Sequence, residues 1–345
     1  MKNMIHLSLY AMMMISQIIW GASCTTSLEN DPCADRIHYK GLLGEEDIEV
    51  DSLLRQVDSA EVEDISQYWE SFNLKSDSIW EEIRFMHRTN RELRVVAHLA
   101  DGDIHYGAIF LPKGYNENAT YPVLLFAPGL NQVNPVVSIN KHSTIWSLSR
   151  KFSSYIIVVP SYRGQSLIVD DRSYCSDGFF GDAFDGATDD ALRLLEVAME
   201  TVNGADSTQV AVYGISRGGT VSLLAAARDK RIKAAISQVG PVDFLRKDVF
   251  DRYNLQYRYQ FLNGEATFEE RRKHILRSSP VHFIHDYENK LLILHGMNDK
   301  TVPLWNADEI LQQREADSLT FHEYWNAGHN FDATDQVKEW LKESM

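Results

Sequence analysis

The chain has 345 residues, of which 44% are apolar, and 49 acidic against 34 basic residues give it a formal net charge of −15. This negative balance argues against nucleic acids and anionic membrane surfaces as partners. The 3 cysteines are too few for a disulfide framework, and no spacing resembles a zinc site. We therefore expect no metal and no other cofactor.

The N-terminal segment is typical of an export signal. Lys2 supplies a short positively charged region, and the apolar stretch from Leu7 to Trp20 has the length of a signal-peptide core, which is too short to be a convincing membrane span. We expect residues 1–23 to be a signal peptide. The mature protein would then be exported to the periplasm or the cell envelope.

Cys24 follows a segment that resembles a bacterial lipoprotein cleavage site, although Gly21 replaces the usual large aliphatic residue. We expect Cys24 to be lipidated, so that a lipid anchor is the protein's only contact with a membrane. Ordinary cleavage after Ser23 is the alternative. In an exported protein, Cys33 and Cys175 either pair or stay as free thiols, and the sequence does not decide between these states.

Residues 24–90 form an acidic, mostly polar extension. Apolar side chains recur at helical spacing from Ser59 to Phe72, which predicts an amphipathic helix. Its aromatic residues are interpreted as packing residues and not as a ligand-binding group.

From residue 91 onward, strand and helix patterns alternate. Residues 93–99 and 104–111 predict a hairpin with an Asp101-Gly102 turn. Buried strands are expected at 121–126, 155–160, 209–213, 232–239, 290–295 and 319–325. The alternation predicts one α/β domain over 91–345, with a mostly parallel central sheet and helices on both faces.

Two further segments, residues 182–200 and 242–279, carry many charged or aromatic side chains. Residues 182–200 predict a helix whose aspartates, Asp185, Asp189 and Asp190, are interpreted as caps and solvated charges and not as metal ligands. Residues 242–279 carry many aromatic side chains and form a small helical insertion. This insertion is either a lid that forms a pocket wall or a surface element that packs on itself.

A nucleophile elbow joins the strand at 209–213 to a helix rich in leucine and alanine. The segment Gly214-Ile215-Ser216-Arg217-Gly218 matches the pattern G-x-S-x-G, in which a tight turn holds the serine hydroxyl above the sheet edge. An incidental serine in a glycine-lined turn is the alternative. The Arg217 N–H at the helix N-terminus is an expected oxyanion donor. The second expected donor is the Leu130 N–H, in the loop after the strand at 121–126.

Two partners for Ser216 follow in the chain. Asp299 lies in the loop after the strand at 290–295, and His329 follows Gly328 on the loop past the last strand. A neutral imidazole can take the serine proton, and a carboxylate can orient that imidazole. The order Ser, Asp, His is that of α/β-hydrolases. His295 is interpreted as strand-end structure, and Asp243 is a reserve carboxylate.

The catalytic half resembles the prolyl oligopeptidase family of serine peptidases and its acyl-hydrolase relatives, over roughly residues 90–345. The matching motifs are Phe110-Leu-Pro-Lys-Gly-Tyr115, Ser161-Tyr-Arg-Gly164, Gly214-Ile-Ser-Arg-Gly-Gly219, His295-Gly-Met-Asn-Asp-Lys-Thr-Val-Pro303 and Gly328-His329. The resemblance implies an α/β-hydrolase fold, with Ser216 as nucleophile, Asp299 as the orienting acid and His329 as the base.

The chain also departs from the family. Arg217 stands where relatives often have tyrosine, and residues 25–90 are too few for the β-propeller of many oligopeptidases, so we expect none there. We also see no Glu-Glu pair of the kind that anchors a free peptide N-terminus in dipeptidyl peptidases. We favour a serine peptidase acting on short peptides. A carboxylesterase or acetyl esterase on exported small or sugar substrates is the first alternative, because the triad serves both reactions. A non-catalytic binding protein on a hydrolase scaffold is the second.

Overall fold

The computed structural model describes residues 49–130, 135–264, 266–314 and 316–345. Its strands are β1 (Ser78–His87), β2 (Arg91–Ala100), β3 (Asp103–Phe110), β4 (Tyr121–Ala127), β5 (Val136–Ser138), β6 (Ile156–Ser161), β7 (Ser166–Val169), β8 (Arg172–Cys175), β9 (Ala205–Ile215), β10 (Ile232–Gln238), β11 (Lys290–Gly296) and β12 (Leu319–Tyr324). Its α-helices are α1 (Val50–Leu53), α2 (Ser59–Ser71), α3 (Thr144–Lys151), α4 (Asp185–Thr201), α5 (Arg217–Arg228), α6 (Lys247–Arg252), α7 (Asn254–Phe261), α8 (Phe268–Arg277), α9 (Trp305–Gln313) and α10 (Thr334–Ser344).

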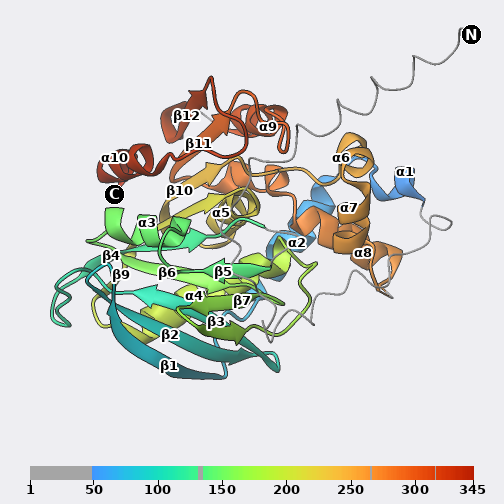
Figure 1. Ribbon diagram of the computed structural model, residues 1–345. Helices are drawn as coiled ribbons and strands as arrows, with labels where there is room; N and C mark the ends of the chain where they lie inside the picture. The colour runs from blue at the N-terminus through green and yellow to red at the C-terminus, as the bar shows by residue number, and fades with distance from the viewer. Residues whose placement is uncertain (1–48, 131–134, 265, 315) are drawn as a thin grey trace, which may run out of the picture.

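One large sheet organises the molecule, with the strand order β1-β2-β3-β6-β4-β9-β10-β11-β12 (Figure 1). The neighbours from β6 to β12 are parallel, and the β1–β2, β2–β3 and β3–β6 pairs are antiparallel. The β2–β3 turn is the expected one, because Asp101 and Gly102 both have positive φ. The α/β-hydrolase fold predicted from the sequence is confirmed.

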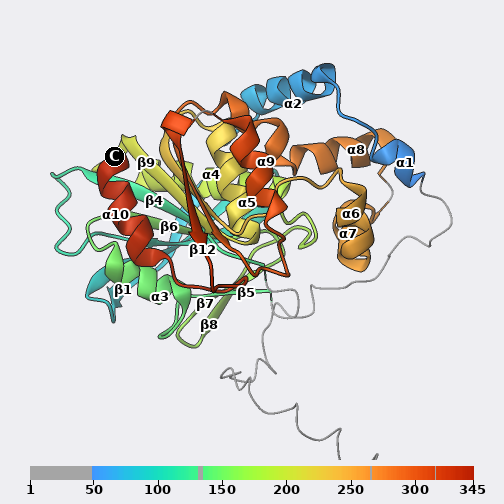
Figure 2. The same ribbon diagram turned by 90° about the horizontal axis from the view of Figure 1, so that it is seen from above.

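The strands are buried on both faces, which is why their sequences read as continuous apolar runs. Along β4, Val123 and Leu125 contribute to one core cluster, while Leu124 and Phe126 contribute to the other. The first cluster contains residues of α4, α5 and α9, and the second contains residues of α3 and α10. Figure 2 shows these two groups of helices on opposite sides of the sheet. Helices therefore cover both faces, as expected.

The helical insertion and the N-terminal extension share a third apolar cluster, which includes Leu53 and Ile65 together with Tyr257 and Ile275. Helices α2 and α8 lie side by side in both views (Figures 1 and 2). The predicted amphipathic helix is thus present as α2, and an Asp58 capping box begins it. Among the described residues, no helix is both long and apolar enough to cross a bilayer.

Three features differ from the sequence analysis or were not foreseen. Strand β1 lies ahead of residue 91 and pairs with β2, and a register shift between Glu81 and Ile83 breaks the alternation by which a strand is recognised. A small sheet, β5-β7-β8, was not expected either. The α4 aspartates are not solvated charges: Asp190 is buried against Arg163 at 2.8 Å, and Asp185 pairs with Arg277 at 2.7 Å.

Candidate active site

Ser216 lies at the turn between β9 and α5, at the carboxyl end of a central strand. Its backbone has φ 58° and ψ −120°, a conformation that residues other than glycine rarely adopt. A Cβ atom on Gly214 would collide with the carbonyl oxygen of Gly218, and one on Gly218 would collide with that of Ala127. Glycine is therefore required at both positions. The strained turn projects the Ser216 hydroxyl above the sheet edge, as the elbow motif predicts.

His329 and Asp299 meet Ser216 from the two neighbouring loops that follow β12 and β11. The His329 Nε2 atom lies 2.9 Å from Ser216 Oγ, and its Nδ1 atom lies 2.7 Å from Asp299 Oδ2. When Nδ1–H donates to the carboxylate, Nε2 is free to accept the hydroxyl proton. The structure thus brings together the three residues that the sequence analysis singled out.

The Asp299 side chain is fully buried, and both of its carboxylate oxygens accept hydrogen bonds. Its Oδ1 atom accepts hydrogen bonds from the backbone N–H groups of Thr301 and Val302 at 2.8 and 2.9 Å. Burial raises the pKa of this carboxyl, but the hydrogen bonds from His329 and from these two backbone groups outweigh it, so the pKa lies below its ordinary value. Asp299 is therefore ionised at neutral pH, as an orienting carboxylate must be.

The two other candidates in this region have structural roles. His295 is buried in β11 and its Nε2 atom lies 2.9 Å from the Val302 carbonyl oxygen. Burial lowers the pKa of this imidazole. Asp243 accepts a hydrogen bond from the Leu245 N–H at 2.8 Å and lies 3.7 Å from His282. It is therefore not the carboxylate that contacts His329.

The two expected oxyanion donors lie on either side of Ser216. Arg217 begins α5, and the Gly129–Leu130 loop packs against Ser216, since a Cβ atom on Gly129 would lie 3.7 Å from the Ser216 Cβ. Among the described residues, neither the Leu130 N–H nor the Arg217 N–H donates a hydrogen bond to another group.

Sequence reasoning used only the backbone of Arg217 and missed its side chain. The guanidinium is buried beneath the Gly129–Leu130 loop, where Nη2 donates to the Gly129 carbonyl at 2.9 Å and to Gln165 Oε1 at 3.1 Å. The group also lies over the ring of Tyr162, 4.3 Å from its centroid. Burial lowers the pKa of Arg217 to about 10, so it stays charged at neutral pH. The only signal in the sequence was the arginine itself, in a position where tyrosine is common.

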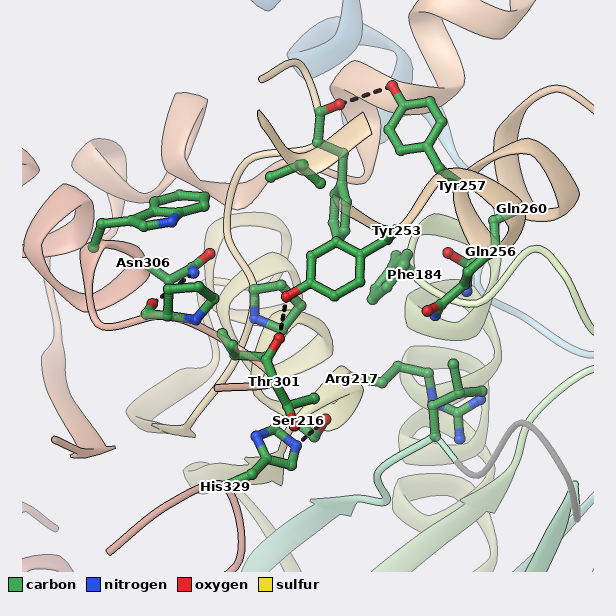
Figure 3. A pocket seen from close by; sticks show the side chains of 17 residues that line it. Phe184, Ser216, Arg217, Tyr253, Gln256, Tyr257, Gln260, Thr301, Asn306 and His329 are labelled. Atoms are coloured by element: carbon green, nitrogen blue, oxygen red, sulfur yellow. Dashed lines mark hydrogen bonds between the residues drawn. The ribbon is translucent and has the colours of Figure 1, made fainter. Parts of the chain in front are cut away.

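A cavity of about 480 Å³ opens above Ser216 and His329 (Figure 3). Its wall is mainly apolar and includes Leu130, Phe184, Phe244, Val249, Val302 and Trp305. Tyr253, which precedes α7, and Gln256, Tyr257 and Gln260 of α7 face the cavity. The insertion therefore lines the cavity, and its aromatic side chains also pack on one another, as in the contact of Tyr257 with Phe261.

Several polar groups in this wall are already bonded to the protein. The Tyr257 hydroxyl donates to the Phe244 carbonyl at 2.8 Å, and the Tyr253 hydroxyl donates to the Thr301 carbonyl. Asn306 bridges Val242 and Pro303 through its side-chain amide. The side-chain amides of Gln256 and Gln260 also line the cavity.

The remaining predictions concern residues away from the cavity. Cys24 and the signal peptide lie outside the described residues. Cys175 is disulfide-bonded, and its partner is also outside them. Within the described ranges, no group of histidine, cysteine or acidic residues is arranged to hold a metal ion.

Solved structures share this fold at low sequence identity. The acetyl xylan esterase 1 of Thermoanaerobacterium sp. JW/SL YS485 superposes with a TM-score of 0.59 and 16% identity, covering 86% of this chain and 99% of the esterase. An acetyl xylan esterase from Paenibacillus sp. R4 gives 0.58 and 16%, covering 86% and 98%. A puromycin-hydrolyzing peptidase of Mycobacterium tuberculosis gives 0.53 and 18%, covering 73% of this chain and 42% of the peptidase.

A family model gives the more specific relationship. The model described as the prolyl oligopeptidase family matches residues 152–345, which is more than half of the chain and includes Ser216, Asp299 and His329. The resemblance seen in the sequence motifs is thereby confirmed. The chain belongs to the prolyl oligopeptidase family.

Proposed function

We propose that Ser216 is the nucleophile of this hydrolase, with His329 as the base and Asp299 as the orienting acid. The contacts of 2.9 and 2.7 Å from His329 to Ser216 and Asp299 are the observation that carries the proposal. Ser216 Oγ forms a bond to the substrate carbonyl carbon while its proton passes to His329 Nε2 and the carbonyl electron pair moves onto oxygen. The N–H groups of Arg217 and Leu130 stabilise that oxyanion.

Collapse of the tetrahedral intermediate completes the first half-reaction. The carbon–nitrogen or carbon–oxygen bond breaks, and the His329 imidazolium gives its proton to the leaving amine or alcohol. Water then repeats the same steps on the acyl-enzyme and releases the acid and Ser216. Each step of this cycle is carried out by the residues named, without a metal or another cofactor.

A fluorophosphonate probe tests this assignment. The probe should label the wild-type protein and spare Ser216→Ala, because phosphonylation forms a serine–phosphorus bond and releases fluoride. Absence of labelling in folded wild-type protein would favour the alternative that this is a binding protein on a hydrolase scaffold.

For the substrate, we favour short peptides with an apolar side chain next to the scissile bond. The cavity of about 480 Å³ is mostly apolar, and its tyrosine hydroxyls and Asn306 are already bonded within the protein. A sugar would place many hydroxyl groups against this wall without partners, which costs free energy. Gln256 and Gln260 can instead bind the main-chain amides of a peptide.

Hydrolysis of esters is the second candidate. It is supported by the two acetyl xylan esterases, whose chains this fold matches almost end to end. Turnover of aminoacyl anilides, short-chain nitrophenyl esters and acetylated sugars should be compared in wild type and Ser216→Ala. Ser216-dependent cleavage of apolar anilides supports the peptidase. Efficient ester hydrolysis without detectable amide cleavage across a broad panel would replace it with the esterase.

We also propose that the protein is exported and anchored by lipid at Cys24, on the sequence motif described above. Metabolic labelling with a palmitate analogue should mark the wild type and not Cys24→Ser. Labelling of both proteins, or of neither, would contradict a lipid anchor at this residue.

A further inference from the structure

The guanidinium of Arg217 is buried without a direct carboxylate contact from the described residues, as is that of Arg91, and the charge of Asp190 acts on it only from beyond contact distance. Within the described part of the chain Arg217 makes no ion pair, and its Nε atom has no hydrogen-bond partner. Arg163, the residue after Tyr162, contrasts with Arg217 by contacting Asp182 and Asp190 at 2.6 and 2.8 Å. Burial of a charge without a counter-ion is costly, and an apolar side chain could fill the same space. A role in the reaction would account for the arginine.

The position of its hydrogen bond suggests that role. The carbonyl that Arg217 holds at 2.9 Å belongs to the peptide unit between Gly129 and Leu130, and so does the Leu130 N–H. Because described peptide bonds are trans, the C=O and N–H of this unit point in opposite directions. A hydrogen bond that fixes the direction of this carbonyl therefore also fixes the direction of the N–H, in a loop that packs against Ser216.

We propose that the Arg217 side chain is a positioning residue of the oxyanion hole, which orients and polarises the Gly129–Leu130 peptide so that the Leu130 N–H meets the oxyanion. The inference rests on the proposed function of Ser216. A charged donor on the carbonyl withdraws electron density from the peptide and strengthens its N–H as a donor. Residue 217 would then supply one donor from its backbone and align the other with its side chain.

The Ser161-Tyr-Arg-Gly164 motif and the residue that follows it, Gln165, contact the Arg217 guanidinium. Tyr162 places its ring against the guanidinium, and Gln165 accepts the second Nη2 hydrogen bond at 3.1 Å. The backbone of Gln165 is itself fixed, since its N–H donates to the Tyr162 carbonyl at 3.1 Å and its carbonyl accepts from the Ser176 N–H at 2.9 Å. The loop after β6 therefore holds the Arg217 side chain, which in turn holds the Gly129–Leu130 loop.

Steady-state kinetics of Arg217→Met test the inference, because methionine retains much of the length and the burial but not the donor. Loss of a whole oxyanion donor costs about 10²–10³-fold in kcat, so misalignment of one donor should cost about 10–100-fold, with KM changed by less than about threefold. Arg217→Lys should recover part of this loss. Gln165→Leu, which removes only the second partner of Nη2, should lose less than Arg217→Met. All rates are divided by the concentration of sites titrated with the fluorophosphonate probe.

A double-mutant cycle links the effect to the oxyanion loop. Leu130→Pro removes the proposed donor, whereas Leu130→Ala retains it and controls for the side chain. If Arg217 acts through this N–H, Arg217→Met in the Leu130→Pro background should cause little further loss. Losses that multiply fully, or an unchanged kcat in folded Arg217→Met, would overturn the inference.

A structural role would have a different signature. It would lower the urea midpoint of Arg217→Met and Gln165→Leu but leave kcat per titrated site unchanged. The fluorophosphonate probe also distinguishes a failure of the function proposed for Ser216 from a failure of the role proposed for Arg217. If wild type is not labelled, the function proposed for Ser216 fails. If wild type and Arg217→Met are labelled at the same rate, only the role of Arg217 fails.

Discussion

Ser216, Asp299 and His329 enter the cavity from loops that directly follow strands β9, β11 and β12, whereas the opposite wall comes from the helices of residues 242–279. The loops are fixed by the sheet and by short backbone hydrogen bonds, such as those from Thr301 and Val302 to Asp299. The helical wall depends on contacts with a distant segment. Arg272 in α8 contacts Glu61 in α2, 211 positions away in the chain.

This difference separates catalysis from substrate binding. A displacement of the helices would break none of the triad hydrogen bonds directly, although Arg252 and Tyr253 contact the loop that carries Asp299. The cavity would not survive it, because Tyr253, Gln256 and Gln260 line it. Variants in the strand-end loops should therefore lower kcat, while variants that loosen the helices should lower stability and raise KM.

The largest effect is expected from Asp299→Asn. The amide keeps the shape of the side chain but no longer stabilises the imidazolium, and it favours the wrong tautomer of His329, so kcat should fall by about 10⁴-fold. Asp243→Asn is the matched control, because Asp243 is a nearby carboxylate that does not contact His329. Its kcat should stay within about twofold of the wild type. Equal losses in the two variants would contradict the assignment of the orienting acid.

The site could be predicted from the sequence because its signals are local. Ser216 is defined by the glycines around it, and Asp299 and His329 each stand just beyond a recognisable apolar strand. The side chain of Arg217 could not be assigned, because its partners Gly129 and Gln165 approach it only in the folded chain. Strand β1 was missed for a local reason, since its register shift hides the period of a strand.

The helical wall was beyond sequence reasoning for a different reason. The aromatic residues of 242–279 fit a pocket wall and a self-packed insertion equally well, and in the structure they do both. Helix α8 contacts the N-terminal extension through Arg272, one charged residue among many, which is buried and contacts Glu61 as well as the Leu53 carbonyl. The α4 aspartates were wrongly interpreted as solvated charges for a similar reason, since their arginine partners come from distant segments.

The next largest effect should come from Arg272→Met, which removes the buried contact between the wall and α2. Breaking a buried ion pair costs about 3–5 kcal/mol, and the lower figure applies here because Glu61 is partly exposed. Lys273→Met, one residue further along α8, removes an exposed pair with Asp64 and should cost less than about 1 kcal/mol. Urea unfolding measures both, and similar losses would contradict the anchoring role of Arg272.

A smaller effect is expected from Glu61→Gln, and it should depend on pH. The hydrogen bond from Arg272 lowers the pKa of Glu61 from 4.5 to about 2. The stabilisation from this carboxylate is therefore complete above pH 4.5 and is lost as the pH falls toward 2. The difference in unfolding free energy between wild type and Glu61→Gln should be about 1–2 kcal/mol at neutral pH and shrink across this window. Glu70→Gln, which removes an exposed charge from the same helix, should leave the Arg272 contribution intact.

The smallest effect should come from Tyr253→Phe. The Tyr253 hydroxyl donates to the carbonyl of Thr301, and Arg252 donates to that of Lys300 at 2.6 Å, so the junction between α6 and α7 is bound to the loop that carries Asp299. Loss of one such bond costs about 1 kcal/mol, which predicts a KM about two- to fivefold higher. The value of kcat should change less, because the backbone of Thr301 and Val302 still holds Asp299 through its own hydrogen bonds. Tyr257→Phe is the comparison, since its hydroxyl bonds to Phe244 within the insertion and reaches no strand-end loop. A fall in kcat larger than the rise in KM for Tyr253→Phe would show that the helical wall and the triad are not independent.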